Sequence, residues 1–318
     1  MFVDIAEKNC ENCARIFMKT LSEIIKINLP KISLLDVGAM KTNESDRYES
    51  LLKSNLIEVI GFEANLSEYI KLKNKKNEKY LNYCLGDGTE KTLYVTNYPG
   101  CTSLYEPNPD IINLFTGIGT DDGNFTVIEK RKIKTHKLKE IKEINKVDVV
   151  KIDTQGSELD ILKNFEKKIK KVLIIESEVE FVELYKDQPL FFDMQNFLSK
   201  NGFVLHKLID IGGRPFRPWT VNNNPAIPIS QLLWADAIFV RDFSKLDKFS
   251  DEDLLKISLF LHEIYNSYDL CYYFLKEYDQ RNKLKLSEIY RKYINSEKKI
   301  NLKFMNLRLS VDTVTTKK

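Results

Sequence analysis

Acidic residues at the ends of apolar runs are the features of this 318-residue chain that could carry chemistry. Asp153 ends a run that begins at Val147, and Glu63 ends a run that begins at Leu56. The crevice beyond the carboxyl ends of parallel strands is the usual ligand site of an open sheet, so both acids are expected at one rim. A carboxylate placed like Glu63 can accept hydrogen bonds from the two hydroxyls of a ribose. A ligand that contains a nucleoside is therefore expected.

The segment after Asp153 is expected to turn and then to enter a helix. Gly156 permits a tight turn, Ser157 is a good candidate N-cap, and the apolar residues that follow can pack the helix on a sheet. An acid before such a turn can also be only a turn former. The functional interpretation therefore depends on the same pattern recurring at other strand ends.

The first apolar run, from Ile32, reaches Gly38, where backbone can approach a ligand closely. Glu63 follows about 25 residues later, as in a βαβ unit. A dinucleotide site needs Gly-x-Gly-x-x-Gly at the start of a helix. This chain has one glycine there, and Glu44 and Asp46 would oppose a diphosphate. NAD is disfavoured, whereas S-adenosylmethionine, with ribose, adenine and a cationic sulfonium but no phosphate, fits better.

The remaining runs predict the other strands of the sheet. A third strand is expected over Lys79–Gly88, and in a methyltransferase sheet the acid that follows it, here Asp87, commonly faces the adenine amino group. Further strands are expected at residues 147–153, 171–179, 202–208 and 234–242, the last two as an antiparallel hairpin. Glu176 and Glu178 end the fifth strand, and we expect only one of them to face the crevice.

Five motifs in order resemble those of the FkbM-type S-adenosylmethionine-dependent methyltransferases. They are Asp-Val-Gly-Ala at 36–39, Gly-Phe-Glu-Ala at 61–64, Leu-Gly-Asp-Gly at 85–88, Thr-Ser-Leu-Tyr-Glu-Pro at 102–107 and the stretch 151–162. The similarity spans residues 34–242. It implies an α/β, Rossmann-like class I methyltransferase fold, with a seven-stranded, mostly parallel sheet and an antiparallel last strand. The cofactor contacts that it implies, together with those argued above, are Asp36, Gly38, Ala39, Glu63, Ala64, Gly86, Asp87, Ser103 and Asp153.

The expected reaction is displacement of the activated methyl group by an oxygen nucleophile, which requires a base. Asp153 is the leading candidate, either as this base or as a partner of the cofactor amino group. Glu158, Glu178 and His206 are alternative bases. A divalent ion held by Asp153 and Glu176 could also deprotonate the acceptor. No motif supports such an ion, so no metal site is expected.

The segment 209–225 combines Gly, Pro and Asn with side chains suited to an acceptor loop. Arg214 and Arg217 could bind phosphate or carboxylate, and Trp219 could stack on a sugar face. Alternatively, the segment is a hairpin insertion whose Trp219 covers the sheet edge. The family resemblance implies O-methylation of sugars, glycans or polyketides, and a saccharide hydroxyl in surface polysaccharide biosynthesis is the favoured acceptor.

Three segments are expected along the chain. Residues 1–30 form a leading helix over about Glu7 to Ile27, residues 31–243 form the methyltransferase domain, and residues 244–318 form a helical extension. A helix is expected to start at Ser250, and another lies over Tyr265–Tyr278. The aromatic faces of this extension suit a lid, a homo-oligomer contact or a brace, and residues 313–318 are expected to fray.

Composition excludes several classes of protein. Hydrophobic residues at 43% and charged residues at 30% exclude a disordered chain, and a formal net charge of +3 gives no case for nucleic acid. No apolar run approaches the roughly 20 residues of a membrane helix, so a cytoplasmic protein is expected. Five cysteines suggest reduced thiols. The pair Cys10 and Cys13 has the spacing of half a metal knuckle, without a second pair.

Three other functions remain open at this point. An NAD-dependent sugar-modifying enzyme would use Glu63 in the same way but would need a diphosphate loop. A glycan-binding module on a degenerate methyltransferase fold would keep the sheet and lose the donor. A nucleic-acid methyltransferase would need a basic groove, and the near-neutral charge balance makes it the weakest of the three.

Overall fold

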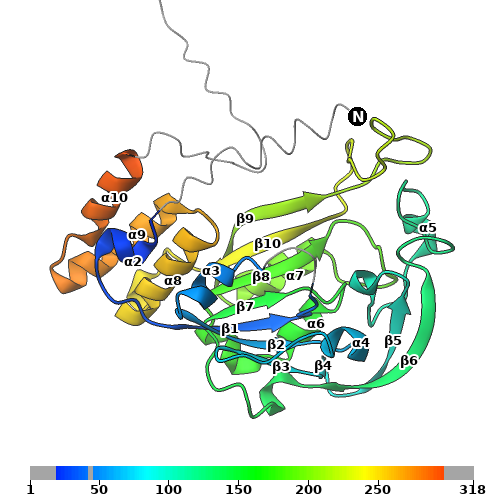
Figure 1. Cartoon of the computed structure of the whole chain (residues 1–318), viewed down its shortest axis with the longest axis horizontal. Coiled ribbons are helices and arrows are strands. Elements are labelled where there is room, and N and C mark those ends of the chain that lie inside the picture. Colours follow the sequence, from blue (N-terminus) through cyan, green and yellow to red (C-terminus); the bar gives the residue numbers. More distant parts are fainter. Residues whose placement is uncertain (1–18, 42–45, 297–318) are drawn as a thin grey trace, which may run out of the picture. The chain divides into compact units, whose positions relative to one another are not determined.

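The computed structural model describes residues 19–41 and 46–296. The chain divides into two compact units (Figure 1). One is Lys31–Leu246, and the other combines Met1–Pro30 with Asp247–Lys318. The predictions that concern Cys10, Cys13, Glu44 and residues 313–318 lie outside the described residues.

The larger unit is built on a seven-stranded sheet. In spatial order its strands are β3 (Glu78–Leu81), β2 (Ile57–Phe62), β1 (Ile32–Val37), β7 (Val149–Ile152), β8 (Ile174–Glu180), β10 (Trp234–Arg241) and β9 (Phe203–Gly212). The first five are parallel, and β10 runs antiparallel to both of its neighbours. This order confirms the Rossmann-like class I methyltransferase fold, in which the carboxyl ends of the central strands β1, β2 and β7 meet at one rim.

Apolar residues of the central strands and of the following helices form the main core. Val150, Ile152 and Ile175 from the sheet pack with Leu159 of α6 and Leu198 of α7, all buried. The helices of this unit are α3 (Glu49–Lys53), α4 (Leu66–Tyr69), α5 (Pro109–Ile112), α6 (Glu158–Lys163) and α7 (Phe191–Lys200). Short 3₁₀ turns connect them at η1 (Pro99–Cys101), η2 (Leu138–Glu140), η3 (Glu166–Lys171) and η4 (Leu246–Lys248). This core fixes the ends of β7 and β8, where the acids lie.

A second, three-stranded sheet has the order β4 (Cys84–Leu85), β6 (Val127–His136) and β5 (Glu90–Thr96). The single strand expected over Lys79–Gly88 is therefore wrong. The parallel sheet ends at β3, because β4 pairs with β6 of the second sheet. As a consequence, Asp87 follows a strand of the second sheet. Between β3 and β4, the side chain of Asn82 donates a hydrogen bond to the backbone oxygen of Glu63 at 2.7 Å.

The smaller unit contains α2 (Leu21–Ile25), α8 (Asp251–Glu263), α9 (Tyr268–Asn282) and α10 (Leu286–Ser296). The expected start at Ser250 is confirmed, since its hydroxyl accepts a hydrogen bond from the backbone N–H of Asp253 at 3.1 Å. The described part of the leading helix is α2, which ends at Lys26 in the left-handed conformation. α10 was not expected from the sequence. None of the helices in the described ranges is long and apolar enough to cross a bilayer.

Candidate active site

A pocket opens at the carboxyl ends of β1, β2 and β7. Including its open mouth, it contains about 680 Å³ of empty space. Five residues expected to contact the cofactor line it, namely Gly38, Glu63, Ala64, Ser103 and Asp153. Its apolar wall includes Met40, Phe62, Tyr83, Leu85, Leu93 and Leu104. The pocket thus combines two carboxylates with a broad apolar surface.

Gly38 brings the turn after β1 against the backbone of Asp153. Its φ is +83°, and a Cβ built on it would lie 1.8 Å from the Asp153 carbonyl oxygen. The N–H of Gly38 donates to the carbonyl of Phe62 at 2.9 Å. Only glycine can occupy this position without moving β1 away from β7.

Glu63 is buried in the pocket wall, with 8% of its surface exposed. One carboxylate oxygen accepts a hydrogen bond from the N–H of Asn65 at 2.7 Å. Burial raises the pKa of Glu63 to about 7, although the hydrogen bond from Asn65 opposes this shift. Within the described ranges no group bonds to its second oxygen, which leaves an acceptor for a ligand hydroxyl.

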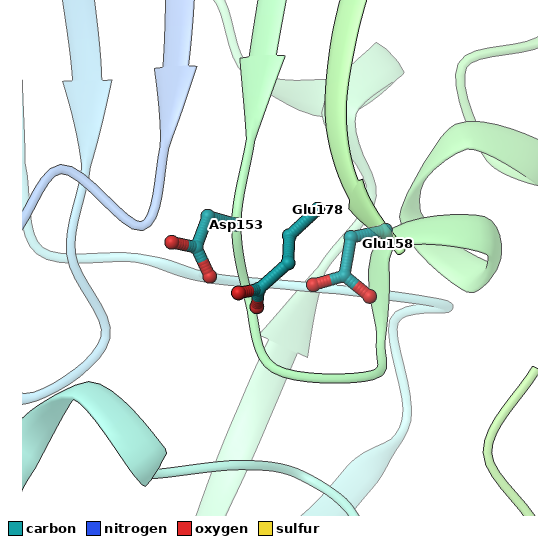
Figure 2. A group of neighbouring side chains, drawn as sticks. All are labelled: Asp153, Glu158 and Glu178. Atoms are coloured by element: carbon teal, nitrogen blue, oxygen red, sulfur yellow. The ribbon is translucent and has the colours of Figure 1, made fainter. Parts of the chain in front are cut away.

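Asp153, Glu158 and Glu178 form an acid cluster, in which ligand oxygens lie within 4.8 Å of one another (Figure 2). Glu158 is committed to the turn, since it accepts hydrogen bonds from the N–H groups of Thr154 at 2.6 Å and Gly156 at 2.9 Å. Burial raises the pKa of Glu158 to about 7. Burial, followed by the charge of Asp153, raises the pKa of Glu178 well above its ordinary value. The cluster therefore holds protons at a pH where an exposed carboxyl would be ionised.

Gln155 joins two acids of this cluster and was not identified from the sequence. Its amide nitrogen donates to Asp153 at 2.9 Å and also to Glu178. Its amide oxygen accepts a hydrogen bond from the hydroxyl of Tyr185 at 2.8 Å, which fixes the orientation of the amide. Ser103 donates to the backbone oxygen of Gln155 at 2.5 Å. Gln155 has φ of 57°, an unusual conformation that persists because these contacts hold it.

Strand alternation does not separate Glu176 from Glu178, contrary to the reason given for expecting only one of them at the crevice. Residues two apart on a strand share a face, so both point to the same side of β8. They differ in their partners, since Glu176 forms an ion pair with Arg47 whereas Glu178 reaches Gln155. Arg47 also pairs with Asp236 at 2.6 Å. Glu178, and not Glu176, belongs to the acid cluster.

Four other residues expected at the cofactor lie outside the pocket wall. Asp36 is buried and accepts hydrogen bonds from Tyr48 at 2.6 Å and Lys151 at 3.2 Å, so it braces β1 on β7. Ala39 is buried, and Gly86 lies against Thr135.

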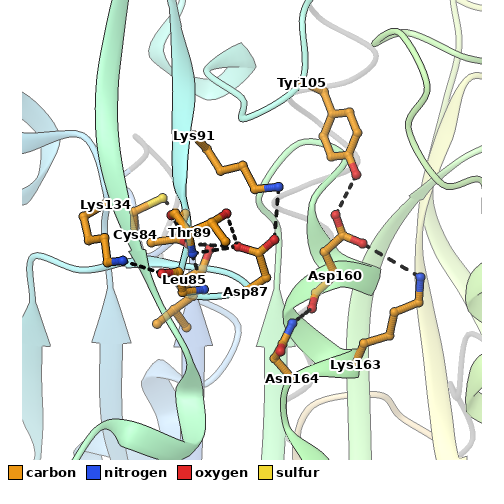
Figure 3. Close-up of polar contacts among 12 residues, drawn as sticks. Cys84, Leu85, Asp87, Thr89, Lys91, Tyr105, Lys134, Asp160, Lys163 and Asn164 are labelled. Carbon is orange, nitrogen blue, oxygen red and sulfur yellow. Dashed lines mark hydrogen bonds and ion pairs between the residues drawn. The ribbon is translucent and has the colours of Figure 1, made fainter.

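Asp87 is the fourth, and its carboxylate closes a local turn. It accepts hydrogen bonds from the Thr89 hydroxyl at 2.6 Å and pairs with Lys91 at 3.1 Å (Figure 3). The hydrogen bonds from Thr89 and then the contact with Lys91 lower the pKa of Asp87. In the same view the hydroxyl of Tyr105 donates to Asp160 of α6.

The residues expected to bind the acceptor are also outside the pocket wall. The guanidinium of Arg214 lies 5.0 Å from the ring of Trp234. Arg217 donates to the backbone oxygens of Phe115 and Ile118 at 2.8 and 2.7 Å. Trp219 is 68% exposed. The alternative base His206 is half-buried on β9, away from the acid cluster.

The acid cluster is also the place where the described residues could hold a cation. Its three carboxylates are ligands that Mg²⁺ or Ca²⁺ accepts. The set differs from the pair Asp153 and Glu176 considered from the sequence. The amide nitrogen of Gln155 already donates to both Asp153 and Glu178, and a cation would have to displace it.

The sheet order together with the pocket at its carboxyl rim defines a class I methyltransferase. The methyltransferase FkbM domain profile matches residues 36–205, slightly more than half of the chain. The chain therefore belongs to the FkbM methyltransferase family, as the motifs predicted. No curated protein matches the chain. One matching solved structure is the precorrin-6y C5,15-methyltransferase of Geobacter metallireducens GS-15, with 10% identity, a TM-score of 0.32, and coverage of 72% of this chain and 92% of that one.

Proposed function

We propose that this enzyme transfers a methyl group from S-adenosylmethionine to a hydroxyl oxygen of a saccharide. The observation that carries the proposal is the position of Glu63, whose carboxylate lies in the same pocket as Asp153 and keeps one oxygen without a described partner. A ribose presents the pair of hydroxyls that such a carboxylate binds. The family assignment supports methyl transfer as the reaction.

The donor half of the pocket is assigned to the turn after β1 and to β2. Gly38 gives the cofactor close access to backbone, Glu63 binds the ribose, and the wall of Tyr83, Leu85 and Leu93 suits the flat faces of adenine. Asp87 is not assigned to the adenine amino group, because its carboxylate is engaged by Thr89 and Lys91. When bound, S-adenosylmethionine supplies an electrophilic methyl group.

The acceptor half is assigned to the acid cluster. Asp153 lines the pocket and can accept the proton of the attacking hydroxyl, while Gln155 keeps the carboxylates of Asp153 and Glu178 in fixed orientations. Glu158 is assigned to the turn, since its oxygens already accept backbone hydrogen bonds. This division leaves Asp153 as the base and Glu178 as the carboxyl that Gln155 links to it.

A saccharide acceptor, in surface polysaccharide biosynthesis in the cytoplasm, is proposed from the family resemblance. We assign catalysis to residues 31–243 and propose that the helical extension, residues 244–318, braces the enzyme or joins two copies.

The test is methyl transfer from methyl-labelled S-adenosylmethionine to a panel of free and nucleotide-linked sugars. The expected product is labelled sugar whose label survives mild base, because a methyl ether resists base whereas a methyl ester is hydrolysed. Each sugar is paired with its deoxy analogue to locate the methylated hydroxyl. Base-labile label would contradict O-methylation of a hydroxyl. Binding of sugars without any binding of the donor would support a glycan-binding module.

A further inference from the structure

The segment of residues 213–232 between β9 and β10, which we call the apolar loop, exposes large hydrophobic side chains. Trp219 is 68% exposed, Ile229 56%, Phe216 45% and Leu232 44%. Leu114, at 48%, lies on the neighbouring segment after α5. Single exposed hydrophobic residues are ordinary, but a group of them on one surface marks an interaction site.

The apolar loop contacts the segment after α5 through ring packing and backbone hydrogen bonds. The rings of Phe216 and Phe115 lie 4.7 Å apart. The N–H of Thr116 donates to the carbonyl of Pro215, and the N–H of Arg217 donates to the carbonyl of Leu114, both at 2.8 Å.

A small core lies beneath this surface. Phe115, Ile118 and Leu233 are buried in it together with residues around η1. The buried side chains of this core lie on the segments that flank the exposed Trp219 and Ile229.

The charges of the apolar loop favour an anionic partner. Although 46 of the 318 residues are acidic, none lies between Asp210 and Asp236. Arg214 and Arg217 lie within this stretch, and no carboxylate of the described residues forms an ion pair with either. Segments that enter a lipid interface typically combine positively charged residues with exposed aromatic and aliphatic side chains, as the apolar loop does.

We propose that the apolar loop docks on the surface of an anionic lipid bilayer. Trp219 and Ile229 enter the interface, and Arg214 and Arg217 lie near lipid phosphates. A saccharide would be held by aromatic faces and hydrogen bonds, whereas three of the five exposed large hydrophobic side chains of the loop, Ile227, Ile229 and Leu232, are aliphatic. The proposal does not depend on the proposed methyl transfer, because it requires neither donor nor acceptor.

The experiment is sedimentation of the full chain with phosphatidylcholine vesicles that contain phosphatidylglycerol. Replacing Trp219, Ile229 and Leu232 together by serine is expected to weaken binding by at least about tenfold. The matched control replaces Ile70, Ile128 and Phe192 by serine; these are 71%, 64% and 78% exposed elsewhere on the same unit. The control is expected to bind like the parent chain.

Two further readouts follow from the mode of docking. Emission from Trp219 is expected to shift to shorter wavelength with vesicles, and Trp219→Phe, which leaves Trp234 as the remaining tryptophan, is expected to abolish the shift but retain most binding. Asp121 and Asp122, on the segment beyond Gly119, oppose an anionic surface, so Asp121→Asn with Asp122→Asn is expected to strengthen binding.

Three outcomes would overturn the proposal. The parent chain could fail to sediment with anionic vesicles, or the two triple-serine variants could bind equally. The parent could also be a dimer that only the apolar-loop variant converts to a monomer, which would make a second copy of the chain the occupant.

Discussion

Gly38→Ala is expected to abolish donor binding, with affinity for S-adenosylhomocysteine reduced by at least about a hundredfold. The added Cβ would lie 1.8 Å from the carbonyl oxygen of Asp153, at a φ of +83° that side chains disfavour. The turn after β1 must then move away from β7, which displaces Gly38 and Asp153 together from the pocket. We also expect a loss of about 2 to 4 kcal/mol of unfolding free energy. Calorimetry and thermal denaturation measure the two effects.

Gly202→Ala is the matched control for this variant. Gly202 has φ of +80°, but a Cβ there would meet only the guanidinium of Arg241, at 3.5 Å. This variant therefore carries the backbone strain without the collision, and it is expected to lose about 1 kcal/mol of stability and to bind the donor product normally. If Gly38→Ala also binds normally, the close approach of β1 and β7 does not shape the donor site.

Asp153→Asn is expected to lower kcat for methyl transfer by about 100- to 10,000-fold, the usual contribution of a general base. The change preserves size and the hydrogen bond to Gln155, so affinity for S-adenosylhomocysteine is expected to stay within a few-fold of the parent value. The assay is transfer of label to the acceptor that the sugar panel identifies. Asp160→Asn, on α6, is the control, because that carboxylate accepts its hydrogen bond from Tyr105 outside the pocket. Full activity of Asp153→Asn would exclude Asp153 as the base.

The dependence of kcat on pH tests whether Glu178 influences the base Asp153 or has only a structural role. Burial, followed by the charge of Asp153, raises the pKa of Glu178, so Glu178 retains its proton at a pH where an exposed glutamate is ionised. Ionised Glu178 adds a negative charge beside Asp153 and the cationic donor, so kcat is expected to rise with pH through the raised pKa of Glu178. Glu178→Gln removes the titrating carboxyl, and this rise is expected to be absent from its pH profile. An unchanged profile would show that Glu178 does not influence the base.

The parallel sheet could be predicted from the sequence because each central strand is an apolar run that ends in a glycine or an acid. Gly38, Glu63 and Asp153 were placed at one rim by that rule, and the pocket indeed contains them. Their positions follow from strand order alone, since the carboxyl ends of adjacent parallel strands converge.

The rest of the site depends on contacts between distant residues. Asp87 was misplaced because β4 leaves the parallel sheet to pair with β6, whose residues lie about 50 positions later in the chain. Gln155 gave no signal because its left-handed backbone and its bond to Tyr185 arise only in the folded chain. The exposure of the apolar loop could not be predicted either, because the sequence does not show whether a tryptophan such as Trp219 is buried or exposed.

The most direct test of the account is calorimetric titration of the purified chain with S-adenosylhomocysteine, alongside Glu63→Ala and Glu58→Ala. Both glutamates lie on or directly after β2, but Glu58 is exposed and pairs with Lys31 at 2.8 Å, whereas Glu63 lines the pocket. We expect micromolar binding by the parent and by Glu58→Ala, and loss of binding in a folded Glu63→Ala. No binding by a folded parent chain, or equal binding by all three, would contradict the assignment of the pocket to S-adenosylmethionine.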